Sequence, residues 1–119
     1  MYAKRWVRLA ELNETLIRLI LGYLGFQPRI VRSSGLSVEG KSSALLVNIC
    51  KALGEQEYLS GAGSSEYLDL DLFQREKIVV KFQKYVEPKY PQLFGQFISN
   101  LSAVDYLFNC APNEWSFGT

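Results

Sequence analysis

The stretch EYLSGAGSSEYLDLDLFQREKIVVKF, residues 57–82, decides the fold of this chain. It opens with a short apolar run, 57–60, which predicts a buried strand, and closes with the β-branched run 78–82, which predicts a second one. A glycine-dense turn leads from the first run into 66–73, where the pattern favours a short helix capped by a serine. A strand, a helix and a strand in this order predict a right-handed crossover between parallel strands.

Further elements are predicted on the N-terminal side of this unit. Apolar residues recur at three- and four-residue spacing over 9–24 and again over 41–53, which predicts two amphipathic helices. Gly25 and Gly54 follow these segments at the position where a helix commonly ends in a left-handed residue. Between the helices, a short apolar run within 28–33, entered through a proline, predicts a third strand.

A last helix completes the predicted order of elements. It starts at Ser99, Asn100 or Ser102 and stops near Pro112. The fold class predicted for the chain is α/β: a small three-layer, Rossmann-like unit with a short, mainly parallel sheet of about three strands flanked by helices. No repeat or linker divides the sequence, so we expect a single domain over 1–119. A sheet this thin has exposed edges, and we therefore expect a homo-oligomer or a complex with a complementary chain.

Composition excludes several classes of function. The chain has 119 residues and no histidine, so it contains no Ser-His-Asp or Cys-His catalytic site and no HExxH zinc site. A net charge of +1 argues against nucleic acid as a partner. Two cysteines are too few for a disulfide scaffold. We also expect the protein to bind no metal ion and no cofactor. The chain shows no secretion signal and no apolar run long enough to cross a bilayer, so we expect a cytoplasmic protein without membrane insertion.

One candidate ligand site lies where the predicted parallel strands end. In an open parallel sheet, ligands bind beyond the carboxyl ends of the strands, and glycines there permit positive φ and close approach to the backbone. A plain turn between a strand and a helix would use the same glycines, so both interpretations remain open. In the ligand-binding interpretation, the backbone amides of 61–65 would hold a phosphate, and Ser33 would supply hydrogen bonds or proton transfer. The candidate residues for binding the ligand are Ser33, Ser34, Ser60, Gly61, Gly63, Ser64 and Ser65.

A second candidate site lies in the proline-containing segment 85–100 and the helix after it. Tyr90 and Gln92 are suited to hydrogen bonding and stacking with a sugar or nucleotide, and Asn100 lies at the end of the same segment. Asp105 falls between apolar residues of the last helix, where it could fix the loop by hydrogen bonds or act as a general base. A stiff loop whose aromatic side chains cover the sheet is the alternative.

Basic side chains accompany the last strand. Two of them would share one face of that strand, and we interpret the group as a basic patch beside the second candidate site or, alternatively, as a solvated strand edge. The residues are Lys77, Lys81, Lys84 and Lys89.

Several short motifs, in order and spacing, resemble the WbqC-like family over nearly the whole chain after Leu9. They are Leu12-Asn13, Gly22-Tyr23-Leu24-Gly25, Val31-Arg32-Ser33-Ser34, Ile49-Cys50-Lys51-Ala52-Leu53-Gly54, Tyr58-Leu59-Ser60-Gly61-Ala62-Gly63, Tyr67-Leu68-Asp69, Tyr90-Pro91-Gln92, Asn100-Leu101-Ser102, Asp105 and Leu107-Phe108-Asn109-Cys110. The resemblance is to the C-terminal half of longer members, whose N-terminal half has no counterpart here.

The resemblance implies a role in the synthesis of O-antigen or related surface polysaccharide. It implies that the protein binds a phosphate-containing donor or a nucleotide-activated sugar, with transfer of an amino acid or acyl group to an amino sugar as one reaction. It supplies no catalytic residue. The alternative is a non-catalytic half-domain that assembles with a partner chain.

Overall fold

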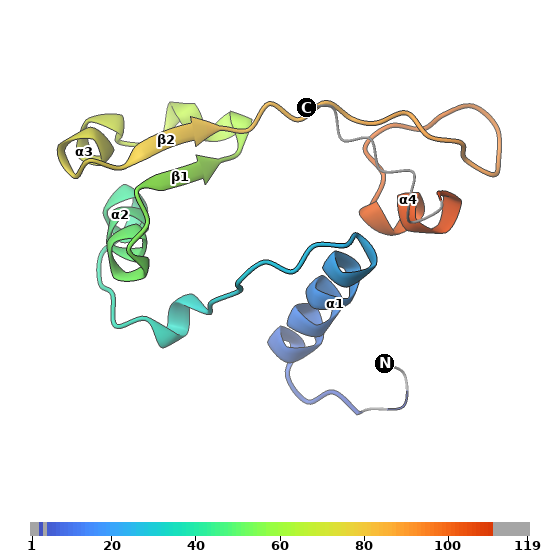
Figure 1. Cartoon of the computed structure of the whole chain (residues 1–119), viewed down its shortest axis with the longest axis horizontal. Helices are drawn as coiled ribbons and strands as arrows, with labels where there is room; N and C mark the ends of the chain where they lie inside the picture. Colours follow the sequence, from blue (N-terminus) through green and yellow to red (C-terminus); the bar gives the residue numbers. More distant parts are fainter. Residues whose placement is uncertain (1–2, 4, 111–119) are drawn as a thin grey trace. The chain divides into compact units, whose positions relative to one another are not determined.

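The computed structural model of the chain describes residue 3 and residues 5–110, and it divides into two compact units (Figure 1). One unit comprises residues 30–85, and the other comprises the described parts of 1–29 and 86–119. The single domain over 1–119 stays a prediction. The helices and strands are α1 (Leu9–Tyr23), α2 (Ser42–Leu53), β1 (Glu57–Ser60), α3 (Leu70–Arg75), β2 (Val79–Phe82) and α4 (Ala103–Asn109), with 3-10 helices at Ser33–Gly35 and Ala62–Glu66.

The two strands that the sequence predicts around residues 57–82 form a parallel sheet (Figure 1). Glu57 of β1 lies opposite Val79 of β2, and Ser60 lies opposite Phe82. Helix α3 connects the strands and contacts both β2 and α2. The predicted α/β class and the parallel pairing are therefore confirmed.

The core of the 30–85 unit covers one face of this sheet. Side chains of β1 and β2 alternate between partly buried and exposed positions, as the two-residue period of a strand requires. The inner set, which includes Tyr58 and Val80, packs against a core of Val47, Cys50, Leu68, Phe73 and Ile78. The outer set, Glu57, Leu59, Val79 and Lys81, is exposed in the described chain.

The strand predicted within 28–33 is wrong. Residues 26–32 belong to no helix or strand of the described chain, and a 3-10 turn begins at Ser33. Val31, an apolar residue of the run that predicted the strand, is 41% exposed. Strand propensity describes a side chain that fits a paired, half-buried surface, and here no second strand supplies one.

The helix predicted over 66–73 is also corrected. Ser64 lies inside a 3-10 helix, and α3 begins only at Leu70. Its N-cap is Asp69, whose carboxylate accepts a hydrogen bond from the Leu72 amide at 3.0 Å. The buried hydroxyl of Ser43 on α2 accepts from the Asp69 amide at 2.9 Å, which ties the start of α3 to α2.

Helices α1 and α2 end as predicted. Gly25 and Gly54 have φ of 75° and 74°, a region that only glycine enters at little cost. The Phe26 amide donates to the Leu21 carbonyl and the Glu55 amide to the Cys50 carbonyl, the six-to-one bond of a Schellman motif.

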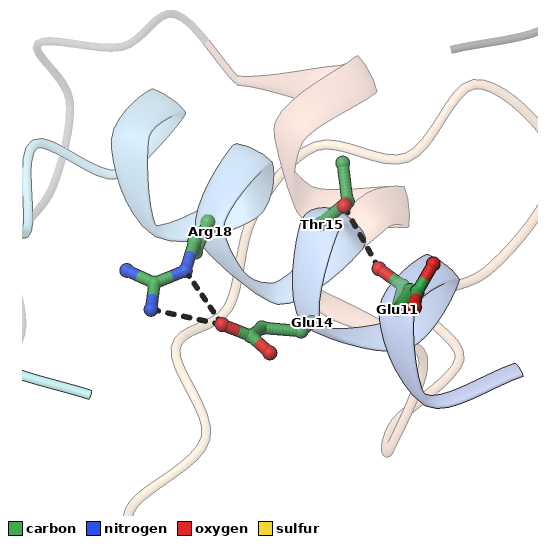
Figure 2. Close-up of polar contacts among 4 residues, drawn as sticks. All are labelled: Glu11, Glu14, Thr15 and Arg18. Atoms are coloured by element: carbon green, nitrogen blue, oxygen red, sulfur yellow. Dashed lines mark hydrogen bonds and ion pairs between the residues drawn. The ribbon is translucent and has the colours of Figure 1, made fainter. Parts of the chain in front are cut away.

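The exposed face of α1 carries short-range polar contacts (Figure 2). Arg18 donates to one oxygen of Glu14, four residues earlier, through two nitrogens at 3.2 and 3.0 Å. Thr15 donates to the carbonyl of Glu11 at 2.8 Å. These contacts are local and exposed, so they support the helix weakly.

Helix α4 begins where the sequence places it. Ser102 is the N-cap, and its hydroxyl accepts from the Val104 amide at 3.2 Å. The helix ends at Asn109, with Cys110 as its extended C-cap, close to the predicted stop near Pro112; Pro112 itself lies outside the described residues.

Candidate functional site

The segments that follow β1 and β2 are neighbours. The Gln83 amide, directly after β2, donates to the Ser60 carbonyl at the end of β1 at 2.8 Å. Ser33 and Ser34 follow no strand and lie exposed in a 3-10 turn. The strand expected before these two serines is not formed, so the reason for placing them at the strand ends is lost, and their binding of a ligand stays a prediction.

The polar groups of the turn after β1 are used by the turn itself. Ser60 and Ser64 are 4% and 5% exposed, and their hydroxyls are in direct contact. The Ser64 hydroxyl donates to the Gly61 carbonyl at 2.6 Å, so Ser60 is the donor in the contact between the two hydroxyls. The Ser64 amide also donates to the Gly61 carbonyl. These bonds stabilise the turn, as buried hydroxyls require.

The glycines of this turn do not need their conformational freedom. Gly61 has φ of −64°, and Gly63 also lies outside the left-handed region. A Cβ added at either position would meet nothing within 4 Å. Ser65 is exposed. The geometry thus gives the segment a structural role, and its binding of a ligand stays a prediction.

The second candidate site is held together by one carboxylate. Asp105, in the first turn of α4, accepts from the Tyr90 hydroxyl at 2.8 Å and from the Gln92 amide nitrogen at 3.4 Å, both at Oδ2. Tyr90 packs edge-on against Phe97 and Tyr106, with ring centroids 5.5 and 4.8 Å apart. Three residues that sequence reasoning selected separately are therefore brought together by the tertiary structure.

Hydrogen bonds to the backbone hold the loop between Tyr90 and α4. The Gln92 side chain donates to the Ile98 carbonyl at 3.0 Å and accepts from the Ile98 amide at 2.8 Å. Asn100, at φ of 59°, donates its amide to a carboxylate oxygen of Glu87. Asn100 thus closes the loop, and its partner Glu87 is a loop residue that the sequence did not single out.

A pocket of about 280 Å³ opens beside this cluster. Asp105 is the one formally charged residue that lines it, and its apolar walls include Phe94 and Phe108, which are 85% and 84% exposed. The sequence analysis missed Phe108 and Asn109, although their three- and four-residue spacing from Asp105 on a helix indicates a common face. The residues that line the pocket are Gln92, Leu93, Phe94, Ile98, Leu101, Asp105, Phe108 and Asn109.

The Tyr90 phenol should ionise above its ordinary pKa. Loss of hydration raises this pKa most, and the hydrogen bond to Asp105 and the charges of Asp105 and Glu87 raise it further, against a lowering by Gln92. Because the pKa of Tyr90 is higher in the folded than in the unfolded chain, the neutral phenol stabilises the folded chain at every pH below the unfolded-state pKa. This stabilisation is lost as the pH rises through the folded-state pKa. We expect Asp105→Ala to return the Tyr90 transition toward its ordinary value.

The measurement is an alkaline titration of tyrosinate absorbance, with Tyr90 isolated as the difference between the wild-type chain and Tyr90→Phe. An Asp105→Ala chain whose Tyr90 transition is unmoved would contradict the observed hydrogen bond.

Two further kinds of site are absent from the part of the chain that the structure describes. Its cysteine, aspartate and glutamate side chains form no group of three that could hold a metal ion. Within that same part, no helix has the length and apolar character needed to cross a membrane.

The fold and the site define a small α/β protein with a parallel strand-helix-strand unit and a carboxylate-centred pocket in its other unit. The model of the WbqC-like protein family matches residues 1–117, and the chain belongs to this family. Over 102 residues it is 32% identical to Rv1507c of Mycobacterium tuberculosis strain H37Rv, a protein described as uncharacterized. The match covers 85% of this chain and 44% of that protein, so the chain spans less than half of its relative's length. No solved structure matches the chain.

Proposed function

We propose that this chain binds the sugar of a nucleotide-activated sugar and takes part in the synthesis of surface polysaccharide. The observation that carries the proposal is the hydrogen-bonded cluster of Tyr90, Gln92 and Asp105 at a pocket with exposed aromatic walls. Polar groups that converge on a mostly apolar pocket are the usual construction of a small-molecule site. Membership of the WbqC-like family supports the polysaccharide role through the resemblance described above.

The charge of the pocket indicates which part of the ligand enters it. Tyr90 and Gln92 both donate to Oδ2 of Asp105, and no residue among 3 and 5–110 donates a hydrogen bond to Oδ1. An ionised carboxylate only accepts, so it favours hydroxyl or amine donors and repels phosphate. The sugar therefore occupies the pocket, with an aromatic ring such as that of Phe108 available to its apolar face, while the phosphates remain outside.

Transfer of an amino acid or acyl group to an amino sugar is the reaction that this proposal includes. An amine on the sugar would be a hydrogen-bond donor to the Asp105 carboxylate, and a charged amine would bind it more strongly. As the amine forms an amide bond with the acyl carbon, the bond between that carbon and its carrier breaks and the carrier leaves with the electron pair. The carboxylate could accept the proton that the amine loses.

Calorimetric titration of the full chain tests the proposal. The ligands are nucleotide-linked amino sugars, nucleotide-linked neutral sugars, the same nucleotides without a sugar, and acyl-coenzyme A. We expect binding that requires the sugar and is strongest for the amino sugars. Equal affinity for nucleotides with and without a sugar, or no binding of any nucleotide sugar, would refute the proposal.

A further inference from the structure

An apolar groove of about 510 Å³ runs between α3 and β2 in the 30–85 unit. Leu70 and Phe73 of α3 form one side of it, and Val80 and Phe82 of β2 form the other. The one charged side chain in its lining is Lys77, in the turn between the helix and the strand. The groove belongs to the opposite unit from the sugar pocket, and the inference drawn from it does not rest on the proposed function.

The edge of β2 next to this groove has free backbone groups. The Val79 amide donates to the Gln56 carbonyl just before β1, and the Gln83 amide donates to the Ser60 carbonyl at the end of β1. Because the direction of backbone groups alternates along a strand, the N–H and C=O groups of Val80 and Phe82 point away from β1. Among residues 3 and 5–110, no strand lies on that side. A row of unpaired backbone groups is a template for another strand, and small sheets gain stability when a third strand is added.

The charges around β2 indicate the chemistry of that strand. Lys81 is paired with Glu57 at 2.6 Å, and Glu76, the nearest carboxylate before β2, is paired with Lys51 at 2.7 Å. Lys77 and Lys84, two residues before and two residues after β2, have no carboxylate partner among the described residues. Positive charge therefore stands at both ends of the free edge.

We propose that the β2 edge and its groove bind an extended segment of another protein. In this segment, apolar residues alternate with polar ones, and carboxylates flank both ends. Its backbone would pair with Val80 and Phe82, and alternate side chains would enter the apolar groove, which is the mode of recognition called β-strand addition. The flanking carboxylates pair with Lys77 and Lys84. A second copy of the chain is the poorer occupant, because antiparallel pairing of two β2 strands would bring their lysines together.

The test uses the full chain and three labelled peptides. The first peptide has two aspartates at each end and alternating valine and threonine between them; the second has lysines in place of the aspartates; the third keeps the aspartates and has proline at its centre. Fluorescence anisotropy measures affinity, and hydrogen exchange measures protection of individual amides. The charge variant is Lys77→Glu with Lys84→Glu, and Lys41→Glu, an exposed lysine outside the groove, is its matched control.

We expect the first peptide to bind, more weakly at high salt, and to protect the amides of Val80 and Phe82. The double charge variant should lose about tenfold in affinity, and Lys41→Glu should change it by less than about twofold. The lysine and proline peptides should bind at least about tenfold more weakly than the first. Equal binding of the peptides, an unchanged affinity in the double variant, or protection at other amides would overturn the inference. Protection of Val80 in the free chain that rises with protein concentration would overturn it in favour of a second copy.

Discussion

Replacing Phe73 by alanine should lower the free energy of unfolding by roughly 3–5 kcal/mol, enough to unfold much of the 30–85 unit. Phe73 is 1% exposed, and its ring stacks on Tyr58 with centroids 5.4 Å apart. It also belongs to α3, the short helix that links the two strands. The core contains few fully buried side chains, so neighbouring residues cannot fill the cavity that the ring would leave.

Far-UV circular dichroism in denaturant measures this loss. Hydrogen exchange at Val47 of α2 locates it, because both tryptophans, Trp6 and Trp115, lie outside residues 30–85 in the sequence and are not probes within that unit. Phe94→Ala removes the same side chain from a position that is 85% exposed, and it should change stability by less than about 0.5 kcal/mol. Equal losses in the two variants would mean that Phe73 is not the centre of the core.

Replacing Asp105 by alanine should weaken binding of the nucleotide sugar roughly ten- to hundredfold, since hydrogen bonds to a charged group contribute roughly 1.5–3 kcal/mol. The change removes the acceptor that the ligand would use and releases Tyr90 and Gln92, whose positions depend on the same carboxylate. Asp105→Asn keeps an acceptor for Tyr90 but loses the charge, so its affinity should fall between those of the wild type and Asp105→Ala.

Calorimetric titration of each variant measures the effect, and circular dichroism confirms that α4 remains folded. Asp71→Ala, which removes an exposed carboxylate from α3, is the matched control and should leave the affinity unchanged. If Asp105→Ala is folded and binds the nucleotide sugar as tightly as the wild type, Asp105 is not part of the binding site.

Local features of the sequence were sufficient to predict most of the elements. The helices that end at Gly25 and Gly54, the capping Ser102 and the two strands around 57–82 depend on residues within a few positions of one another. Periodicity, caps and left-handed glycines are encoded at that range. Asp69 shows the limit of such reasoning, because Ser64, Ser65 and Asp69 all fit a helix N-cap. Ser64 is instead buried against Ser60, which leaves the capping position to Asp69.

The same limit applies to the candidate site. Tyr90, Gln92 and Asp105 could each be selected from the sequence as unusual residues in their segments, but nothing in their spacing requires one carboxylate to accept from both of the others. Ser33 and Ser34 were selected by a rule for strand ends, and the rule failed because the strand before them was absent.

By itself, the sequence determined where α1 and α2 end, where α4 begins, and that residues 57–82 form a parallel strand-helix-strand unit. The tertiary structure alone decided that 28–33 finds no partner strand, that the hydroxyls of Ser60 and Ser64 face each other, and that Tyr90 meets Asp105. The physical reason is how far apart in the sequence the interacting residues lie. Backbone hydrogen bonds within a helix and the dihedral preference of a glycine are settled between near neighbours, whereas strand pairing and a shared carboxylate depend on which distant segments the packing brings together.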